Sequence, residues 1–359
     1  MTLPLIHLSG SPYEQGSQHG EALREQIAHN LDLYFARFAG EVGLDRAEVL
    51  GRARRYLAAL QTNSSDFYAG LLGLAAGSGF PLDELAALNV RYEILYYQFG
   101  ANAMADGCTA FAIERDASAN GHVLLGQNWD WIPGVQGALL QTNEPGGLQT
   151  LSFTEAGIFG GKIGLNSAGV GLAVNGLTST SDNWARLSAP FHARCSAVLR
   201  AGDFDRAIAA ATHAQRACTS NFLIAHASGQ IADVEAAPDT ARLIEAENGC
   251  LVHTNHLLDP DALGVAEPPS DLRPGSCQRY ERMSALLERH RPATIADLQA
   301  ALADHDGQPK AICRHVDPNR GPAEQYVTVV AAIMDLETRS LSISDGPPCT
   351  QAFDTYRLH

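Results

Sequence analysis

The sequence predicts an α+β protein in which stacked, mainly antiparallel sheets are covered by helices. Three observations favour this class. Residues 12–105 carry apolar side chains at helical spacing, whereas strand-like segments dominate from Thr109 onwards. Strands and helices then occur in blocks and not as alternating βαβ units. The glycines of 160–171 lie in hairpin-like strands and do not open a helix, so they are not a dinucleotide-binding fingerprint.

The N-terminal segment is expected to form three helices, with Gly77-Ser-Gly79 as a break before the third. The predicted helices are 13–38, 45–60 and 81–99. The third carries Asn89, Arg91 and Glu93 within an otherwise apolar pattern. This polar trio predicts either a solvated face with helical ion pairs or a structural role beneath a functional site.

The remainder of the chain is expected to alternate between hairpins and helix pairs. The predicted strands are 109–115, 122–129, 149–155, 158–165, 170–177, 219–227, 230–236, 241–246, 251–256, 326–335 and 340–344. The predicted helices are 191–200, 204–213, 275–290 and 294–305, with Asp203 as the N-cap of the second.

Composition limits the class of protein. A chain of 359 residues with 45% hydrophobic content can bury a large core, in one domain or two coupled ones. No apolar run reaches the roughly 18 residues of a membrane span, and residues 1–9 lack a secretory signal pattern. The seven scattered cysteines have no CxxC spacing, which predicts reduced thiols and a cytoplasmic setting. A net charge of −15 disfavours a nucleic-acid partner.

The most informative stretch is 106–131, which is typical of a hairpin. Two strand-like segments flank the polar turn 116–121, and the pairing is centred near residue 119. This register places Cys108 almost opposite Asp130. Directly opposed residues have β-carbons about 4.5–5.5 Å apart. We therefore expect a thiol and a carboxylate to be neighbours at one end of a sheet.

The residue before the thiol suggests a specific reaction. Gly107 has no Cβ, so a neighbouring group can approach its carbonyl. Attack by Cys108 would shift the peptide bond from nitrogen to sulfur, and water would then release Cys108 as a new chain start. The freed α-amine, with an ordinary pKa of about 7.7–8.0, is a base attached to the nucleophile. The alternative is an inert buried cysteine.

These residues resemble a known family. Asp106-Gly107-Cys108-Thr109 followed by Gly126-Gln127-Asn128-Trp129-Asp130 is similar to the acyl-coenzyme A:6-aminopenicillanic acid acyltransferase family, the self-cleaving N-terminal-nucleophile cysteine amidohydrolases. Weaker matches extend over most of the chain. They are Gly10-Ser-Pro-Tyr-Glu14-Gln-Gly16, His19-Gly20, Asn89-Val-Arg91-Tyr-Glu93, His253-Thr254-Asn255-His256 and Gly346-Pro-Pro-Cys349.

The resemblance implies a four-layer αββα sandwich that cleaves itself after Gly107. Residues 1–107 would form a helical small chain and 108–359 a large chain carrying the sheets, the two remaining together as one globular unit. The implied substrate is a small N-acyl compound, with acyl-coenzyme A as a candidate acyl donor. No bound cofactor, metal or membrane partner is expected, whereas a homo-oligomer is compatible with the sequence.

The resemblance also implies roles for single residues. Cys108 is the expected nucleophile, Asp130 the carboxylate that orients its amine, and Asn255 the donor to the oxyanion. The expected supporting residues are Gly107, Thr109, Asn128, His256, Ser220 and Arg314. For Arg314, a surface salt bridge is the competing interpretation. Ala110 departs from the fungal enzyme, which has Thr there, so a hydroxyl linked to processing or substrate handling is missing.

Two other functions stay open at this point. An unprocessed relative would act as a metal-dependent hydrolase or as a binding protein without chemistry. His253 and His256 suggest the metal, but a spacing of three on a strand points them to opposite faces. No His-Glu-x-x-His helix or nearby cysteine pair completes a ligand set.

Overall fold

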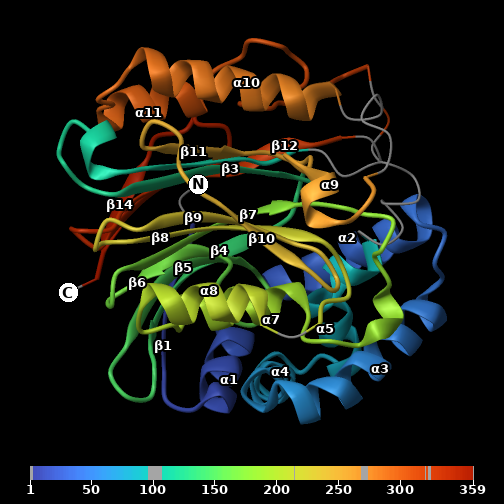
Figure 1. The fold of residues 1–359 in the computed structure, drawn as a ribbon. Helices are drawn as coiled ribbons and strands as arrows, with labels where there is room; N and C mark the ends of the chain where they lie inside the picture. The colour runs from blue at the N-terminus through green and yellow to red at the C-terminus, as the bar shows by residue number, and fades with distance from the viewer. Residues whose placement is uncertain are drawn as a thin grey trace.

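The computed structural model describes residues 3–95, 107–213, 215–267, 274–319, 321 and 325–358. It has four layers: helices α10 and α11, a six-stranded sheet, an eight-stranded sheet, and a layer of helices that includes α1, α4, α7 and α8 (Figure 1). The predicted α+β class and αββα architecture are therefore confirmed.

The eight-stranded sheet has the order β1-β4-β5-β6-β7-β8-β9-β10. Its strands are β1 (Leu5–Ser9), β4 (Gly137–Asn143), β5 (Gln149–Glu155), β6 (Ile163–Asn166), β7 (Val170–Gly176), β8 (Ser220–His226), β9 (Ile231–Ala236) and β10 (Ala241–Ile244). β1 runs parallel to β4, and the other neighbours pair antiparallel. The N-terminal segment thus contributes a strand to the sheet that the rest of the chain builds.

The six-stranded sheet carries the predicted hairpin at its centre, in the order β11-β2-β3-β12-β13-β14. Its strands are β11 (Cys250–His253), β2 (Thr109–Ile113), β3 (Leu124–Trp131), β12 (Val327–Asp335), β13 (Ser340–Asp345) and β14 (Asp354–Arg357). Every residue of β2 and β3 is buried. The polar side chains of β3 must therefore find partners inside the protein.

The helices of the N-terminal segment are α1 (Pro12–Ala22), α2 (Arg24–Glu41), α3 (Arg46–Asn63), α4 (Ser65–Ser78) and α5 (Leu82–Asn89). The later helices are α7 (Phe191–Leu199), α8 (Phe204–Thr212), α9 (Pro260–Leu263), α10 (Pro274–Arg289) and α11 (Ile295–Leu302). Side-chain caps fix several starts: Ser11 closes a capping box with Glu14, and Asp203 accepts from the backbone N of Arg206, as predicted.

Several expected elements differ from the structure. The single helix predicted for 13–38 is two helices that meet at Leu23. β1, β4, β14 and α4 were not predicted, and the strand expected from 158 begins only at Ile163. The helix expected over 81–99 ends at Asn89, is helical again over 91–95, and has its last residues outside the described ranges.

The core has two main parts. A large cluster of buried apolar side chains joins the N-terminal helices to both sheets, and it includes Phe38, Leu74, Trp129 and Phe153. A smaller cluster, with Phe111, Met283 and Leu298 among its members, lies between the six-stranded sheet and helices α10 and α11. The hairpin β2–β3 contributes to both clusters, so its end is fixed from both faces.

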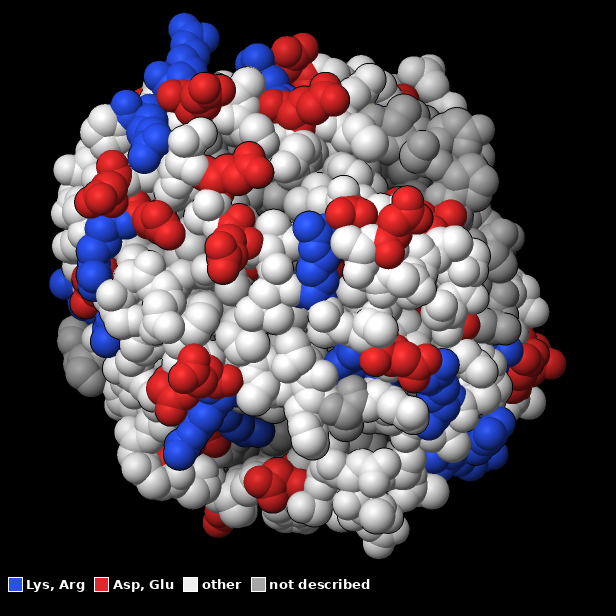
Figure 2. All heavy atoms as spheres, in the orientation of Figure 1, with Lys and Arg blue, Asp and Glu red and all other residues white. Residues whose placement is uncertain are grey.

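The surface drawn in Figure 2 mixes acidic and basic side chains, with no continuous basic area on that face. The expected absence of a nucleic-acid partner stays a prediction. Within the described ranges, no helix is both long enough and apolar enough to span a bilayer.

Candidate active site

Cys108 immediately precedes β2, and the hairpin brings it beside Asp130. The observed register pairs Thr109 with Asn128 and Ile113 with Leu124, one residue away from the expected pairing. The Cys108 Sγ lies 3.9 Å from the backbone oxygen of Asp130. Because paired residues share a face, the shift places the Asp130 side chain on the face of Gly107 and Thr109. Cys108 and Asp130 are neighbours through the Asp130 backbone, but the expected direct opposition of their side chains is wrong by one residue.

Gly107 occupies a tight position, where an added Cβ would require Asp130 to shift by a few tenths of an ångström. A Cβ built there would lie 3.0 Å from the Asp130 oxygen and 3.1 Å from the Asp130 Cβ. The Gly107 N–H donates to Oδ1 of Asn255 at 2.8 Å. The peptide bond expected to break is therefore held between the end of β3 and the segment that follows β11.

Asp130 is buried, and its carboxylate contacts residues of the strand and loop beside it. The Thr328 hydroxyl donates to Asp130 Oδ1 at 2.7 Å, and Arg314 Nε lies 3.4 Å from Oδ2. Arg314 is itself buried, so its interpretation as a surface salt bridge is wrong. Its guanidinium balances the negative charge of Asp130, since both side chains are buried.

Asn255 is fixed from several directions. Its backbone N donates to Ser276 Oγ at 2.8 Å, and its Nδ2 donates to the Gly176 oxygen at 3.0 Å. His256 Nδ1 lies 2.8 Å from the same Ser276 hydroxyl. The expected support of Asn255 by His256 therefore runs through Ser276, and the side-chain amide of Asn255 is held next to Gly107.

Arg279 is the main site residue that the sequence analysis missed. Its Nη1 donates to the backbone oxygen of Cys108 and, at 2.9 Å, to Thr109 Oγ1, while Nη2 donates to Asn255 Oδ1 at 3.0 Å. The side chain is almost fully buried. Residue 279 precedes the buried Met283 and Leu287 by four and eight positions, so it belongs to the buried stripe of α10. A charged residue in that stripe was the available signal.

The remaining supporting residues have structural contacts. Asn128 Nδ2 donates to the backbone oxygens of Leu302 and Ile312, each at 2.8 Å. Ser220 pairs in β8 with Gly176, whose carbonyl accepts from Asn255. These contacts position segments around the site.

A buried charge cluster lies beneath Cys108. Lys162 Nζ is 3.1 Å from the ring centroid of Trp129 and 2.5 Å from Glu155 Oε1. Arg91 pairs with Glu155 from the helical side. Burial opposes the charged form of Glu155, but Arg91 and Lys162 outweigh it and hold the pKa of this carboxyl below its usual range.

The polar trio of the N-terminal segment belongs to this buried region. Asn89 Nδ2 donates to the Gly157 oxygen at 2.8 Å, and Glu93 Oε1 accepts from the Phe191 N–H at 2.6 Å. Asn89, Arg91 and Glu93 are all buried. The solvated-face interpretation is therefore wrong, and the trio supports the strands beneath the candidate nucleophile.

The environment of Cys108 favours the neutral thiol. Burial and the nearby Asp130 charge raise the pKa of Cys108 to about 11, against the opposing influence of Arg279 and Lys162. A thiol with this pKa is protonated at neutral pH, so nucleophilic attack needs a base to take its proton.

His253 is occupied by other partners. Its Nδ1 lies 2.9 Å from the Thr254 oxygen, and its Nε2 lies 3.1 Å from Glu235 Oε1 and 3.8 Å from Asp233 Oδ2. Burial lowers the pKa of His253, but the two acids outweigh it and raise the value to about 9. Among the described residues, neither His253 nor His256 belongs to a convergent group of three or more metal-ligand side chains.

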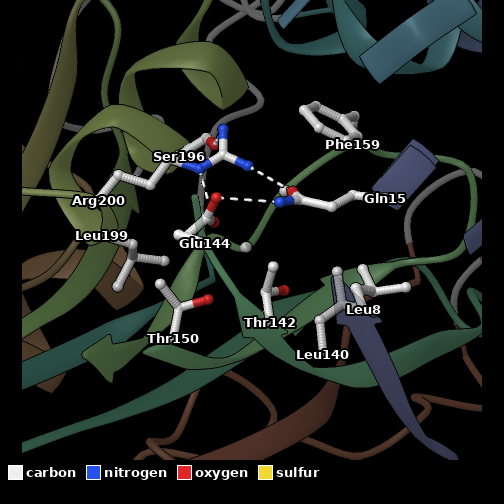
Figure 3. Close-up of a pocket in the computed structure, with 12 residues that line it drawn as sticks. Leu8, Gln15, Leu140, Thr142, Glu144, Thr150, Phe159, Ser196, Leu199 and Arg200 are labelled. Atoms are coloured by element: carbon white, nitrogen blue, oxygen red, sulfur yellow. Dashed lines mark hydrogen bonds and ion pairs between the residues drawn. The ribbon is translucent and has the colours of Figure 1, made fainter. Parts of the chain in front are cut away.

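The pocket in Figure 3 lies away from this site, between α1 and the edge of the eight-stranded sheet. Its polar side is a three-residue network. Gln15 Nε2 donates to Glu144 Oε2 at 3.1 Å, and Arg200 donates to Glu144 at 2.7 Å and to Gln15 at 2.8 Å (Figure 3). None of the predicted site residues lines it.

Comparison with known proteins identifies the family. A model described as "Acyl-coenzyme A:6-aminopenicillanic acid acyl-transferase" matches residues 117–347, more than half of the chain. The chain therefore belongs to this family. The matched range contains Asp130, Asn255, Arg279 and Arg314, whereas Cys108 precedes it.

One curated relative agrees with this assignment, and more distant solved structures also match the chain. The chain is 28% identical over 317 residues to the 40 kDa form of acyl-coenzyme A:6-aminopenicillanic-acid-acyltransferase of Emericella nidulans, covering 86% of this chain and 85% of the relative. Among solved structures, a conjugated bile acid hydrolase from Clostridium perfringens has a TM-score of 0.45 and 12% identity, covering 70% of this chain and 97% of that one. Penicillin V acylase from Agrobacterium tumefaciens has a TM-score of 0.45 and 14% identity, covering 66% of this chain and 83% of that one. Membership of the family supports an enzyme of the acyltransferase or amide-hydrolase type.

Proposed function

We propose that the chain is a cysteine amide hydrolase or acyltransferase that activates itself by cleavage after Gly107. The observation that carries this proposal is the buried arrangement around one peptide bond. Asn255 and Arg279 contact Gly107 and Cys108 directly, and Asp130 lies beside both. These side chains satisfy the buried Gly107 N–H and Cys108 carbonyl, so an amide and a guanidinium are held next to the bond proposed to break.

The proposed self-cleavage is an N-to-S acyl shift followed by hydrolysis. The Cys108 sulfur adds to the Gly107 carbonyl carbon, and the C–N bond breaks as the thiol proton passes to the departing amine. One water then hydrolyses the thioester. The products are a Gly107 carboxylate, a free Cys108 thiol and a free α-amine.

The freed α-amine is the proposed base of the catalytic cycle. It takes the thiol proton, and the thiolate forms a thioester with the acyl group of a small N-acyl amide, whose amine leaves with a proton. Water or a second amine then accepts the acyl group. Asp130 would hold the protonated α-amine, and the Asn255 amide would stabilise the oxyanion. The candidate substrates are N-acyl compounds, with acyl-coenzyme A as an alternative acyl donor.

Intact mass of the purified protein tests the proposal. We expect two chains, one ending at Gly107 and one starting at Cys108, and turnover of at least one member of a panel of N-acyl amino acids, N-acyl amines and acyl-β-lactams. Cys108→Ala should give a single chain without turnover. Cys250→Ala, which changes a half-buried thiol outside the site, is the matched control and should be processed normally. A full-length chain that persists through long incubation at neutral pH would contradict self-cleavage.

A further inference from the structure

A cluster of four metal-ligand side chains lies on the segments that flank Arg314. His305 follows α11, Cys313 and His315 precede β12, and Cys349 follows β13. Their ligand atoms all lie within 4.8 Å of one another. The four residues span 44 positions, from His305 to Cys349, so their convergence is produced by the fold and not by a local motif.

The distances match the edges of a tetrahedron around one zinc ion. Bonds of about 2.3 Å to sulfur and about 2.0–2.1 Å to nitrogen place two sulfurs about 3.7 Å apart, two nitrogens about 3.3 Å apart and mixed pairs about 3.5 Å apart. The Cys313 and Cys349 sulfurs are 3.6 Å apart, and the His305 and His315 Nε2 atoms are 3.2 Å apart. His315 Nε2 lies 3.2 Å from Cys349 Sγ and 3.8 Å from Cys313 Sγ.

We propose that His305, Cys313, His315 and Cys349 bind one Zn²⁺ in a structural site. Two thiolates and two imidazoles are ligands that Zn²⁺ prefers, whereas Mg²⁺ and Ca²⁺ take oxygen ligands. Four protein ligands fill the tetrahedron, so no position is left for water or substrate. A catalytic zinc centre keeps one position open, so the four protein ligands here are typical of a structural site.

The competing arrangement is a disulfide between Cys313 and Cys349. Their sulfurs are 3.6 Å apart, whereas a disulfide bond is about 2.0 Å long. A disulfide also gives no reason for two imidazoles to turn toward the same point. The convergence of all four groups therefore favours the metal.

The zinc would fix the segment that contains Arg314, whose guanidinium contacts the Asp130 carboxylate. The Cys313 N–H donates to the Asp304 oxygen at 2.9 Å, and the Arg314 N–H donates to Thr328 Oγ1 at 2.9 Å. Thr328 and Arg314 both contact the Asp130 carboxylate. Metal binding would thus join α11, the start of β12 and the end of β13 beside the wall of the candidate active site.

Metal analysis of the full chain tests this site. The protein, expressed in zinc-supplemented medium, should contain about one zinc per chain by elemental mass spectrometry. Cys349→Ser and His305→Ala replace exposed ligands, so these variants should fold while losing most of the metal. Cys250→Ser is the matched cysteine control and should keep it. Zinc retained by both ligand variants, or a Cys313–Cys349 disulfide in the mass spectrum of the native protein, would overturn the proposal.

Three further measurements test this site independently of the proposed chemistry. Cobalt bound in place of zinc should give the intense absorption of a tetrahedral thiolate complex, and Cys349→Ser should abolish that absorption. Cys108→Ala should bind zinc with unchanged stoichiometry, since the metal site is independent of self-cleavage. A chelator should lower the melting temperature of the wild type and leave that of Cys349→Ser unchanged. An equal chelator effect on both proteins would contradict a structural zinc at this position.

Discussion

Asp130 supplies a buried negative charge at the candidate site. Asp130→Asn keeps the size of the side chain and an acceptor for Thr328, but it removes the charge that pairs with Arg314. We expect a folded protein with turnover lowered by on the order of 10² or more, the range of a general-base contribution. Steady-state kinetics and circular dichroism measure the two effects. Asp205→Asn on the surface is the control. A near wild-type rate would exclude the proposed role of this carboxylate.

A substitution at Asn255 distinguishes a role in the chemical step from a role in substrate binding. An oxyanion donor acts mainly on the transition state, so Asn255→Ala should lower kcat by roughly 10²–10³, or about 2.7–4 kcal/mol, while KM changes little. The Gly107 N–H also loses its Asn255 acceptor, so we expect slower self-cleavage. The kinetics are therefore measured on fully processed protein. A large rise in KM at constant kcat would assign Asn255 to substrate binding instead.

At the residue scale, strand and turn patterns predicted the local partner of Cys108, the family resemblance supplied the distant Asn255 and Arg314, and Arg279 was missed. Cys108 and Asp130 belong to one hairpin, and turn chemistry brought their pairing to within one residue of the observed register. Arg279 donates to Thr109 from 170 positions away, and Arg314 reaches Asp130 across 184. The first contact depends on how α10 packs on the sheet and the second on how the segment before β12 does, and single-chain periodicity encodes neither.

Helices α1 and α4 pack with their backbones in direct contact. A Cβ added at Gly73 would overlap the carbonyl oxygen of Tyr13, and one added at Gly16 would overlap that of Gly70. The many glycines of α4 weaken its helical signal, and this explains why the sequence analysis missed it. The missed strands β1, β4 and β14 have seven residues or fewer, and β1 and β14 are edge strands.

This contact predicts a strong effect of one added methyl group. Gly73→Ala should lower the free energy of unfolding by roughly 1–3 kcal/mol, the usual cost of overpacking, because backbone atoms cannot move aside easily. Gly51→Ala in α3 is the matched control. It has open space around its Cβ position and should be neutral or slightly stabilising. Urea unfolding compares the two, and an equally stable Gly73→Ala would show that the helices can separate without cost.

His19 makes the contact between α1 and the turn after β5 sensitive to acid. Its buried ring accepts from the Gly157 N–H at 3.2 Å, and burial lowers its pKa to about 4 from an ordinary 6.5. The unfolded chain therefore binds the proton first as pH falls. The stability present above pH 6.5 is lost as pH falls toward 4, by up to roughly 3 kcal/mol. His19→Gln keeps an acceptor without titrating, so the difference between wild type and variant in acid unfolding isolates this effect. Parallel curves would exclude it.

At the scale of the whole molecule, residues 1–107 and 108–359 share structure that cleavage after Gly107 would not remove. β1 pairs along its whole length with β4. Asn30 exchanges hydrogen bonds with Gln136 and donates to the Ala156 oxygen. Arg91 and Tyr34 both contact the buried Glu155. Residues 1–107 and 108–359 therefore contribute to one core, whereas the chain division after Gly107 stays a prediction.

These contacts predict that the two processed chains remain associated and separate only on unfolding. The network of Gln15, Glu144 and Arg200 joins the two parts outside the apolar core (Figure 3). Arg200→Ala removes the cation between Glu144 and Gln15 and should lower the urea concentration at which the small chain is released. Arg206→Ala, which removes an exposed ion pair with Asp203, should change stability by no more than about 0.5 kcal/mol. Gel filtration across a urea series, with circular dichroism on the same samples, measures release and unfolding together. Loss of the small chain from a still-folded large chain in the absence of urea would contradict a shared core.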